Sequence, residues 1–306
     1  MNTWLYTHPA CLEHDTGPGH PESAARLRAV LSALEAPRFQ DLQRHEPPRA
    51  TREQLQRVHT ADYVNRVLSA VPTTGQRTLD ADTLLSPGSG EAALRAAGAL
   101  TDAVDQIMAG ALEHAFCAVR PPGHHAEAAR AMGFCLFNNV MVGAAQAAAV
   151  HGLERIAVVD FDVHHGNGSQ HMITGRAPYR FFSSQQSPLY PGTGSQNERG
   201  EQNCWNVPLA PGAGSKEFRE AWETTLLPAL DHYAPQLILV SAGFDGHALD
   251  PLAGLELHAE DYGWLTEALC RLARQHSEGR LISTLEGGYH LQALAECAAA
   301  HVEALL

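Results

Sequence analysis

The segment 155–168, RIAVVDFDVHHGNG, places acidic and imidazole side chains directly after a short apolar run. Asp160, Asp162 and His164 are spaced two residues apart. Because side chains of an extended backbone alternate between two faces, this spacing predicts that the three point the same way. Two carboxylates and an imidazole are groups that bind a divalent metal. The segment is therefore a candidate metal site, although on its own it is also consistent with a polar turn between a strand and a helix.

A further carboxylate, Asp245, follows another apolar run in the sequence SAGFDGH. With Asp162 and His164 it makes three protein ligands, the number that a catalytic metal keeps when one position stays open for water or substrate. Zinc fits this set, and ferrous iron or manganese would accept the same ligands. Asp160 is left to hydrogen-bond a histidine or to help hold a monovalent cation with backbone carbonyls.

Two other segments carry groups that could act on a substrate beside a metal. His124 and His125 follow two prolines and a glycine in RPPGHH, and histidine is the side chain best placed to act as a base near neutral pH. Tyr289 follows two glycines in EGGYH, where close backbone approach leaves its hydroxyl free to reach a carbonyl. Phe134 and Tyr190, on separate loops, are candidates either for the walls of a narrow channel or for core packing.

The elements that must position these segments alternate along the chain. Short apolar runs predict buried strands, and stretches with a helical period predict the helices between them. In open α/β sheets, ligands bind beyond the carboxyl ends of the strands. Because each polar segment follows an apolar run, we expect the segments to converge on one edge of a mostly parallel sheet with helices on both faces. The strands expected directly before them cover 115–119, 156–159, 236–240 and 280–285.

The remaining pattern predicts one three-layer α/β domain over residues 1–306, since neither a linker nor a break in composition divides the chain. The first ninety residues are expected to form a helical, loop-rich flank, with the helical stretch at 52–70 divided near Thr60. The loop expected at 73–90 is long enough to suggest a functional role. Further strands are expected at 4–7 and 179–183, and helices at 22–34, 91–111, 139–150, 216–230, 259–275 and 291–305.

Composition indicates a globular protein with a cytoplasmic location. The 306 residues carry a net charge of −13, which argues against a nucleic-acid surface because phosphate contacts need a basic patch. The same charge would attract a lysine-bearing peptide or a polyamine. Six scattered cysteines without a CxxC pair indicate reduced thiols. Neither a signal peptide nor an apolar run of membrane-spanning length is visible, so we expect no membrane contact.

With these segments in view, the chain resembles the histone deacetylase superfamily, and most of all the bacterial class II-type deacetylases and their acetylpolyamine amidohydrolase relatives. The resemblance covers nearly the whole chain through motifs that occur in order: HDTGPGHPE, SPGSGEAALRAAG, RPPGHHAE, MGFCLFNN, DFDVHHGNG, YPGTG, SAGFD and LEGGY. It implies an arginase-like fold with a parallel sheet of about eight strands. It also implies zinc-dependent hydrolysis of an amide in an acetylated substrate.

The resemblance gives each candidate a role. It implies that His125 is the main general base, that His124 assists it, and that Tyr289 polarises the acyl oxygen. It implies that Asp160 pairs with His124 and that Asn167 contacts His125; class I members have Asp at the position of Asn167. The implied zinc ligands are Asp162, His164 and Asp245. The implied ligands of a structural potassium ion are Asp160, Asp162, His164 and Ser183.

The substrate channel implied by the resemblance is lined by Phe134, Tyr190 and Leu252. Tyr190 departs from the Phe that is common at its position. Polyamine-selective relatives carry a Glu directly after the Asp-Pro pair, where this chain has Leu252. We therefore expect acetyl-lysine peptides as substrates, with acetylpolyamines or other small acylated amines as the alternative. An oligomer is left open.

Two other functions compete with this interpretation. A two-manganese ureohydrolase of the arginase type would draw extra ligands from His247 and Asp250 beside Asp245, although His247 stands where such an enzyme needs an Asp. A metal-stabilised module that binds acyl-lysine without catalysis would have lost the base or Tyr289, and the chain keeps both.

Overall fold

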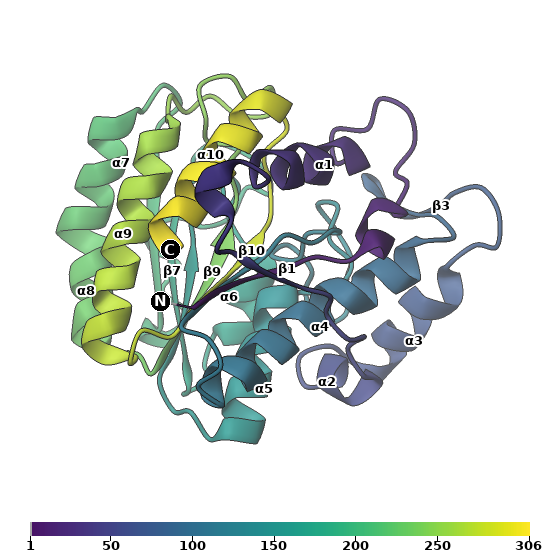
Figure 1. Cartoon of the computed structure of the whole chain (residues 1–306), viewed down its shortest axis with the longest axis horizontal. Helices are drawn as coiled ribbons and strands as arrows, with labels where there is room; N and C mark the ends of the chain where they lie inside the picture. Colours follow the sequence, from purple (N-terminus) through teal and green to yellow (C-terminus); the bar gives the residue numbers. More distant parts are fainter. Residues whose placement is uncertain (1) are drawn as a thin grey trace.

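Eight parallel strands form the central sheet within residues 2–306, which is the part of the chain that the computed structural model describes (Figure 1). Their order across the sheet is β2-β1-β5-β10-β9-β6-β7-β8. This confirms the predicted α/β class with a mostly parallel sheet, while the single-domain division at 1–306 stays a prediction. The strands are β1 (Thr3–Tyr6), β2 (Gln43–His45), β5 (His114–Cys117), β6 (Ile156–Asp160), β7 (Tyr179–Gln186), β8 (Cys204–Leu209), β9 (Leu237–Ala242) and β10 (Leu281–Leu285).

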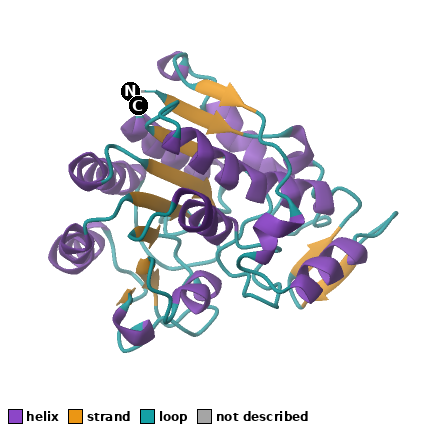
Figure 2. Ribbon diagram, turned by 90° about the horizontal axis from the view of Figure 1, so that it is seen from below, coloured by secondary structure: helices purple, strands orange, loops and turns teal. Residues whose placement is uncertain are grey.

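Helices cover both faces of the sheet and make three layers (Figure 2). One layer comprises α1 (Ala24–Ala33), α7 (Ser215–Ala221), α8 (Leu227–Tyr233), α9 (Ala259–His276) and α10 (Leu291–Leu305). The other comprises α4 (Ser89–Met108), α5 (Asn139–His151) and α6 (Asn167–Ile173), with α2 (Arg52–Gln56) and α3 (Ala61–Ala70) beside them. No helix within residues 2–306 is long and apolar enough to span a membrane.

The four central strands, β5, β10, β9 and β6, are neighbours in the sheet and are buried along their whole length. Strands buried on both faces read as continuous apolar runs, which is why the sequence indicated them. Each is followed by one of the four polar segments found in the sequence. Because parallel strands end at the same edge, these segments emerge side by side, as expected.

The structure differs from expectation mainly outside this centre. Strands β2 and β8 were not expected: β2 is a three-residue polar strand, and β8 contains Pro208; both lie at the edges of the sheet, where a proline is tolerated. The expected loop at 73–90 contains a hairpin of β3 (Arg77–Asp80) and β4 (Thr83–Leu85), whose polar residues carry no strong strand pattern. A π-helical turn at Trp222–Leu226 separates α7 from α8 where one helix was expected.

A buried ion-pair cluster joins the first loop of the chain to two of the central segments. Glu22 accepts hydrogen bonds from Arg26 (3.0 Å) and, through both carboxylate oxygens, from Arg120. Arg26 also donates to the carbonyl oxygens of Glu286 (2.6 Å) and Gly288 (2.5 Å). Burial raises the pKa of the Glu22 carboxyl, but the two arginines outweigh burial and lower it to about 2. The cluster therefore fixes the front of the chain to the loops that follow β5 and β10.

Replacing Glu22 should destabilise the fold strongly. Glu22→Gln leaves two buried guanidinium groups without their counter-ion, which we expect to cost about 3–5 kcal/mol in urea unfolding. Glu53→Gln, which removes an ion pair whose carboxylate is 85% exposed, is the matched control and should change the unfolding midpoint little. An unchanged midpoint for Glu22→Gln would contradict the tethering role.

The same cluster predicts how stability depends on pH. The folded pKa of Glu22 lies below its ordinary value of 4.5, so its contribution is complete above pH 4.5 and is lost as the pH falls toward 2. Urea midpoints measured between pH 6 and pH 3 should therefore fall more steeply for the unmodified chain than for Glu22→Gln. Parallel curves would show that Glu22 does not contribute to acid unfolding.

Candidate active site

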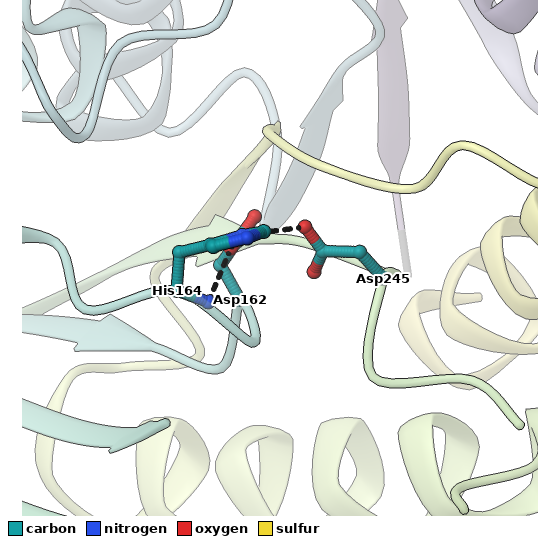
Figure 3. A group of neighbouring side chains, drawn as sticks. All are labelled: Asp162, His164 and Asp245. Carbon is teal, nitrogen blue, oxygen red and sulfur yellow. Dashed lines mark hydrogen bonds and ion pairs between the residues drawn. The ribbon is translucent and has the colours of Figure 1, made fainter. Parts of the chain in front are cut away.

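Asp162, His164 and Asp245 come together at the carboxyl edge of β6 and β9 (Figure 3). Nδ1 of His164 lies 3.2 Å from Oδ1 of Asp162 and 3.1 Å from Oδ2 of Asp245. One ligand atom from each residue lies within 4.8 Å of the others, and all three residues are at most 9% exposed. Two carboxylate oxygens and an imidazole nitrogen that share one buried point fit a divalent cation. The structure thus assembles the three residues that the sequence indicated as a metal site.

The backbone that carries this group is not extended, contrary to expectation. Strand β6 ends at Asp160, and the following residues turn. The N–H of Asp162 donates to Oδ1 of Asp160 (3.1 Å), and the N–H of His164 donates to Oδ1 of Asp162 (2.9 Å). Aspartate favours such turns because its carboxylate accepts from the backbone two residues on. The same two-residue spacing that suggested a strand therefore produces two successive turns.

Three glycines leave room for three buried carboxylates. A Cβ atom at any of these positions would overlap the carboxylate oxygen that packs against it. None of the three glycines lies in the left-handed region, so glycine is needed here for space rather than for backbone freedom. The pairs are Gly166 with Asp160, Gly243 with Asp162, and Gly287 with Asp245.

His124 and His125 are adjacent and buried but have different partners. Nδ1 of His124 lies 3.0 Å from Oδ2 of Asp160, and Nδ1 of His125 lies 2.8 Å from Oδ1 of Asn167. Because the amide nitrogen of Asn167 donates to Glu127 (2.9 Å), its oxygen is left to accept from His125. Nδ1 of His125 therefore carries the proton, and its Nε2 is free to accept one.

The two imidazoles have pKa values shifted in opposite directions. Burial lowers the pKa of His124, but the carboxylates of Asp162 and Asp160 outweigh burial and raise it to about 10. Burial keeps the pKa of His125 well below its usual range, and the neighbouring His124 and His164 lower it further. Neighbouring groups whose pKa values diverge in this way are typical of a pair that divides acid and base roles.

A pocket with a volume of about 240 Å³ opens beside this group. All three residues expected to form a channel, Phe134, Tyr190 and Leu252, line it. The ring of Tyr190 stands edge-on to His125, with centroids 5.2 Å apart. The other lining residues are Asp82, Pro122, His124, His125, Gly133, His164, Leu189, Gly287 and Tyr289. The pocket therefore brings the histidine pair, one candidate metal ligand and Tyr289 to one apolar-walled space.

The wall formed by Phe134 depends on an unusual turn. Gly133 and Phe134 both have positive φ angles, of 55° and 68°, and the N–H of Cys135 closes the turn on Met132 (3.0 Å). The β3–β4 hairpin caps this turn, since Oδ1 of Asp82 accepts from Gly133 (3.1 Å) and Oγ1 of Thr83 accepts from Phe134 (3.2 Å). The hairpin found within 73–90 thus supports the pocket wall; the length of this segment had suggested a functional role, although not this contact.

Tyr289 is held from two directions. The guanidinium of Arg26 lies 4.8 Å from the centre of its ring, and the N–H of Tyr289 donates to Oδ2 of Asp250 (2.6 Å). Burial raises the pKa of the phenol well above its usual range, although Arg26 opposes the shift. The phenol therefore keeps its proton and can donate a hydrogen bond into the pocket.

Glu286 bears on the site but was not singled out by the sequence patterns. Oε2 of Glu286 accepts from the N–H of Gly123 (2.7 Å) and of His124 (3.2 Å), so it fixes the histidine loop. Its position directly before the two glycines of EGGYH was the only feature of the sequence that could have pointed to it.

Ser183, an implied potassium ligand, lies opposite Asp160 in the pairing of β6 with β7, and its hydroxyl donates to Gln185 (2.8 Å).

The extra ligands of a two-metal site are used elsewhere. His247 accepts the N–H of Leu249 through Nδ1 (3.1 Å), and Asp250 accepts backbone N–H groups through both oxygens. Within residues 2–306, the group of metal-binding side chains around His164 and Asp245 does not include either residue.

Comparisons with known proteins agree on one family. A family model described as the histone deacetylase domain matches residues 20–305. The chain is 41% identical over 300 residues to uncharacterized protein slr0245 of Synechocystis, covering 96% of each chain. It is 37% identical over 326 residues to the histone deacetylase-like amidohydrolase of Pseudomonas aeruginosa, covering 99% of this chain and 86% of that protein. The solved structure of the HDA15 HD domain matches with a TM-score of 0.94 at 33% identity, over 99% of this chain and 88% of that one.

The contact between Gly133 and His125 gives a test of the site geometry. A Cβ atom at Gly133 would overlap the ring of His125, whereas one at Gly152, which has a similar φ of 66°, would meet open space. Gly133→Ala should therefore lower the free energy of unfolding by about 1–3 kcal/mol more than Gly152→Ala does. Urea unfolding of both variants measures the difference. Equal losses would show that His125 does not press against this turn.

Proposed function

The chain belongs to the histone deacetylase family, and we propose that it is a zinc-dependent amidohydrolase that removes acetyl or other acyl groups from acetyl-lysine-like substrates. The observation that carries the proposal is the meeting of His164, His125 and Tyr289 in one narrow pocket. A metal ligand, a base with a free nitrogen and a protonated phenol are the groups that amide hydrolysis needs.

Asp162, His164 and Asp245 are the residues proposed to hold the metal. Their donor set of two carboxylate oxygens and one imidazole nitrogen suits zinc and leaves a position for substrate. Zinc at such a site supplies Lewis acidity, which polarises a carbonyl and makes water a better nucleophile. The carboxylates also need a cation on electrostatic grounds, since both are buried within a few ångströms of each other.

The proton transfers are assigned to the histidine pair. Nε2 of His125 takes the proton from the attacking water, because its Nδ1 is occupied by Asn167 and its pKa is held low. His124, kept protonated by the carboxylates of Asp162 and Asp160, supplies positive charge beside the reaction and assists proton delivery to the leaving amine. The hydroxyl of Tyr289 donates a hydrogen bond to the acyl oxygen as negative charge develops there.

The pocket walls support a lysine-like substrate. Phe134, Tyr190 and Leu252 present apolar surface that fits the methylene chain of an acylated lysine. Leu252 offers no negative charge to a second amine, so acetylated polyamines are the alternative substrates rather than the first choice. The potassium site over Asp160 and Ser183, the cytoplasmic location and any oligomer stay predictions.

Removing the hydroxyl of Tyr289 should separate catalysis from metal binding. Tyr289→Phe loses a hydrogen bond made to the developing oxyanion, so turnover of a fluorogenic acetyl-lysine peptide should fall about 10²- to 10³-fold. Zinc content, measured by mass spectrometry of the purified protein, should stay the same. Tyr190→Phe, which removes the other pocket hydroxyl, is the matched control and should keep most activity. Near-normal turnover by Tyr289→Phe would refute the oxyanion role.

A substrate panel tests the substrate class. We expect faster turnover of acetyl-lysine peptides than of acetylspermidine or acetylputrescine, and no turnover after treatment with a chelator. Leu252→Glu should shift the ratio of kcat/KM values toward acetylspermidine by about tenfold or more, because it places a carboxylate on the pocket wall. Leu249→Glu, at a residue 56% exposed on the same loop and outside the pocket lining, is the control. Preference of the unmodified chain for acetylspermidine would favour the polyamine alternative.

A further inference from the structure

We propose that Asp250 is a positioning residue that holds Tyr289 in its productive place through the backbone. This inference rests on the proposed function, because it assigns a residue that acts through the phenol of that site. Asp250 follows β9 five residues after Asp245, and it is 7% exposed.

The carboxylate of Asp250 bridges two loops. Its Oδ2 accepts from the N–H of Tyr289 (2.6 Å) and of His290 (3.3 Å), and its Oδ1 accepts from the N–H of Leu252 (3.0 Å). One side chain therefore connects the loop after β9, which carries a pocket-wall residue, to the loop after β10, which carries the phenol.

Asp250 has no cationic partner, unlike most of the other buried carboxylates around the site; Glu286, which also accepts backbone N–H groups, is the other exception. Asp160 and Asp162 lie beside His124, and Glu22 lies between Arg26 and Arg120. Among the residues that the structure describes, none forms an ion pair with Asp250 within 4.0 Å. A buried charge without a counter-ion is costly, so its hydrogen bonds to the backbone are its compensation. The backbone of Tyr289 is thus the main structure that this carboxylate orders.

The segment around Tyr289 needs such a fixed point. Gly288 has a φ of 121°, a conformation that glycine reaches easily and other residues rarely do. The neighbouring peptides are tied by other groups: the N–H of Gly287 donates to Asp162 (2.8 Å), and the carbonyl of Gly288 accepts from Arg26 (2.5 Å). The next backbone N–H after this glycine is that of Tyr289, and it donates its hydrogen bond to Asp250.

The position of Asp250 also matches the helix that follows. His290 caps the start of α10, where its Nδ1 accepts from the N–H of Ala293 (3.3 Å). A carboxylate bound to the N–H groups just before a helix interacts favourably with the positive end of the helix dipole. Asp250 therefore fixes where α10 begins and, with it, the direction in which Tyr289 leaves the chain.

A double-mutant cycle tests this inference. Asp250→Ala should lower kcat for an acetyl-lysine peptide about 10- to 100-fold, since small displacements of a reacting group are costly. KM should change less than about threefold and zinc content should stay unchanged, because neither substrate contacts nor metal ligands are removed. In the Tyr289→Phe background, Asp250→Ala should lower kcat by less than about threefold, because the hydroxyl that it positions is already gone.

Two further variants guard the cycle against effects on folding. Asp250→Asn keeps the size and one acceptor oxygen, so it should recover part of the kcat that alanine loses, and it replaces the alanine variant in the cycle if that protein does not fold. Asp261→Ala is the matched control, because Asp261 is also buried and accepts a backbone N–H at the start of a helix, but it pairs with Arg219. It should lower stability without changing the effect of Tyr289→Phe.

The outcomes separate this inference from the proposed function. If Asp250→Ala lowers kcat by the same factor in both backgrounds, Asp250 does not act through the hydroxyl of Tyr289, and the inference is overturned while the deacetylase proposal stands. If Tyr289→Phe alone leaves kcat unchanged, the oxyanion role in the proposed function fails first. A large effect of Asp250→Ala that disappears in the Tyr289→Phe background supports both.

Discussion

Negative charge that is shut away from water at the carboxyl edge of the central strands is the constraint on which the rest of the site depends. Asp160, Asp162 and Asp245 are at most 1% exposed, and burial alone would raise the pKa of each carboxyl. Hydrogen bonds from nearby backbone N–H groups offset part of this cost of burial; the donors include Asp162, Val163 and Gly287. Each of these carboxylates also packs against a glycine, at a position where a Cβ atom would overlap its oxygen. These glycines, in the motifs HGNG, SAGFD and EGGY, therefore provide the space in which the three acidic side chains can be buried.

The same constraint explains why the front of the chain belongs to the site although it supplies no reacting group. Glu22 is a buried carboxylate whose compensation comes from arginines on two different segments, Arg26 and Arg120. Besides this ion pair, Arg26 donates hydrogen bonds to carbonyl oxygens of the loop after β10, and its guanidinium lies over the ring of Tyr289. Glu22 and Arg26, near the start of the sequence, thus help to determine where the phenol lies. This contact gives a physical reason for the motif HDTGPGHPE, which lies outside the catalytic segments. Its Glu22 neutralises the buried guanidinium of Arg120, for which the catalytic loops supply no carboxylate.

The sequence could predict those parts of the structure whose signal is local. The central strands appear as apolar runs because both faces are buried, α10 was expected with the bounds it has, and the break near Thr60 is the cap of α3. Strands β2 and β3 could not be found in this way, because their residues are mostly polar, and β2 in addition pairs with a strand far from it in the sequence. The same distinction holds in the site. The metal-binding group and the histidine pair were recognisable from residue type, whereas Glu286 and Asp250 act through hydrogen bonds to backbone groups far along the chain, which residue type does not reveal.

The histidine pair shows how little separates two functions in such a site. Both imidazoles are buried, adjacent and bonded through Nδ1 to an oxygen, but His124 lies beside the carboxylates of Asp162 and Asp160, whereas His125 is bonded to an uncharged amide. A carboxylate stabilises the imidazolium form, and the pKa of His124 rises; an amide oxygen carries no net charge, and burial then keeps His125 neutral. Once His124 is charged, it disfavours a second positive charge on His125. Protonation of His124 therefore helps to keep His125 neutral. The choice of Asn167 over an acidic residue therefore contributes directly to which histidine can accept a proton.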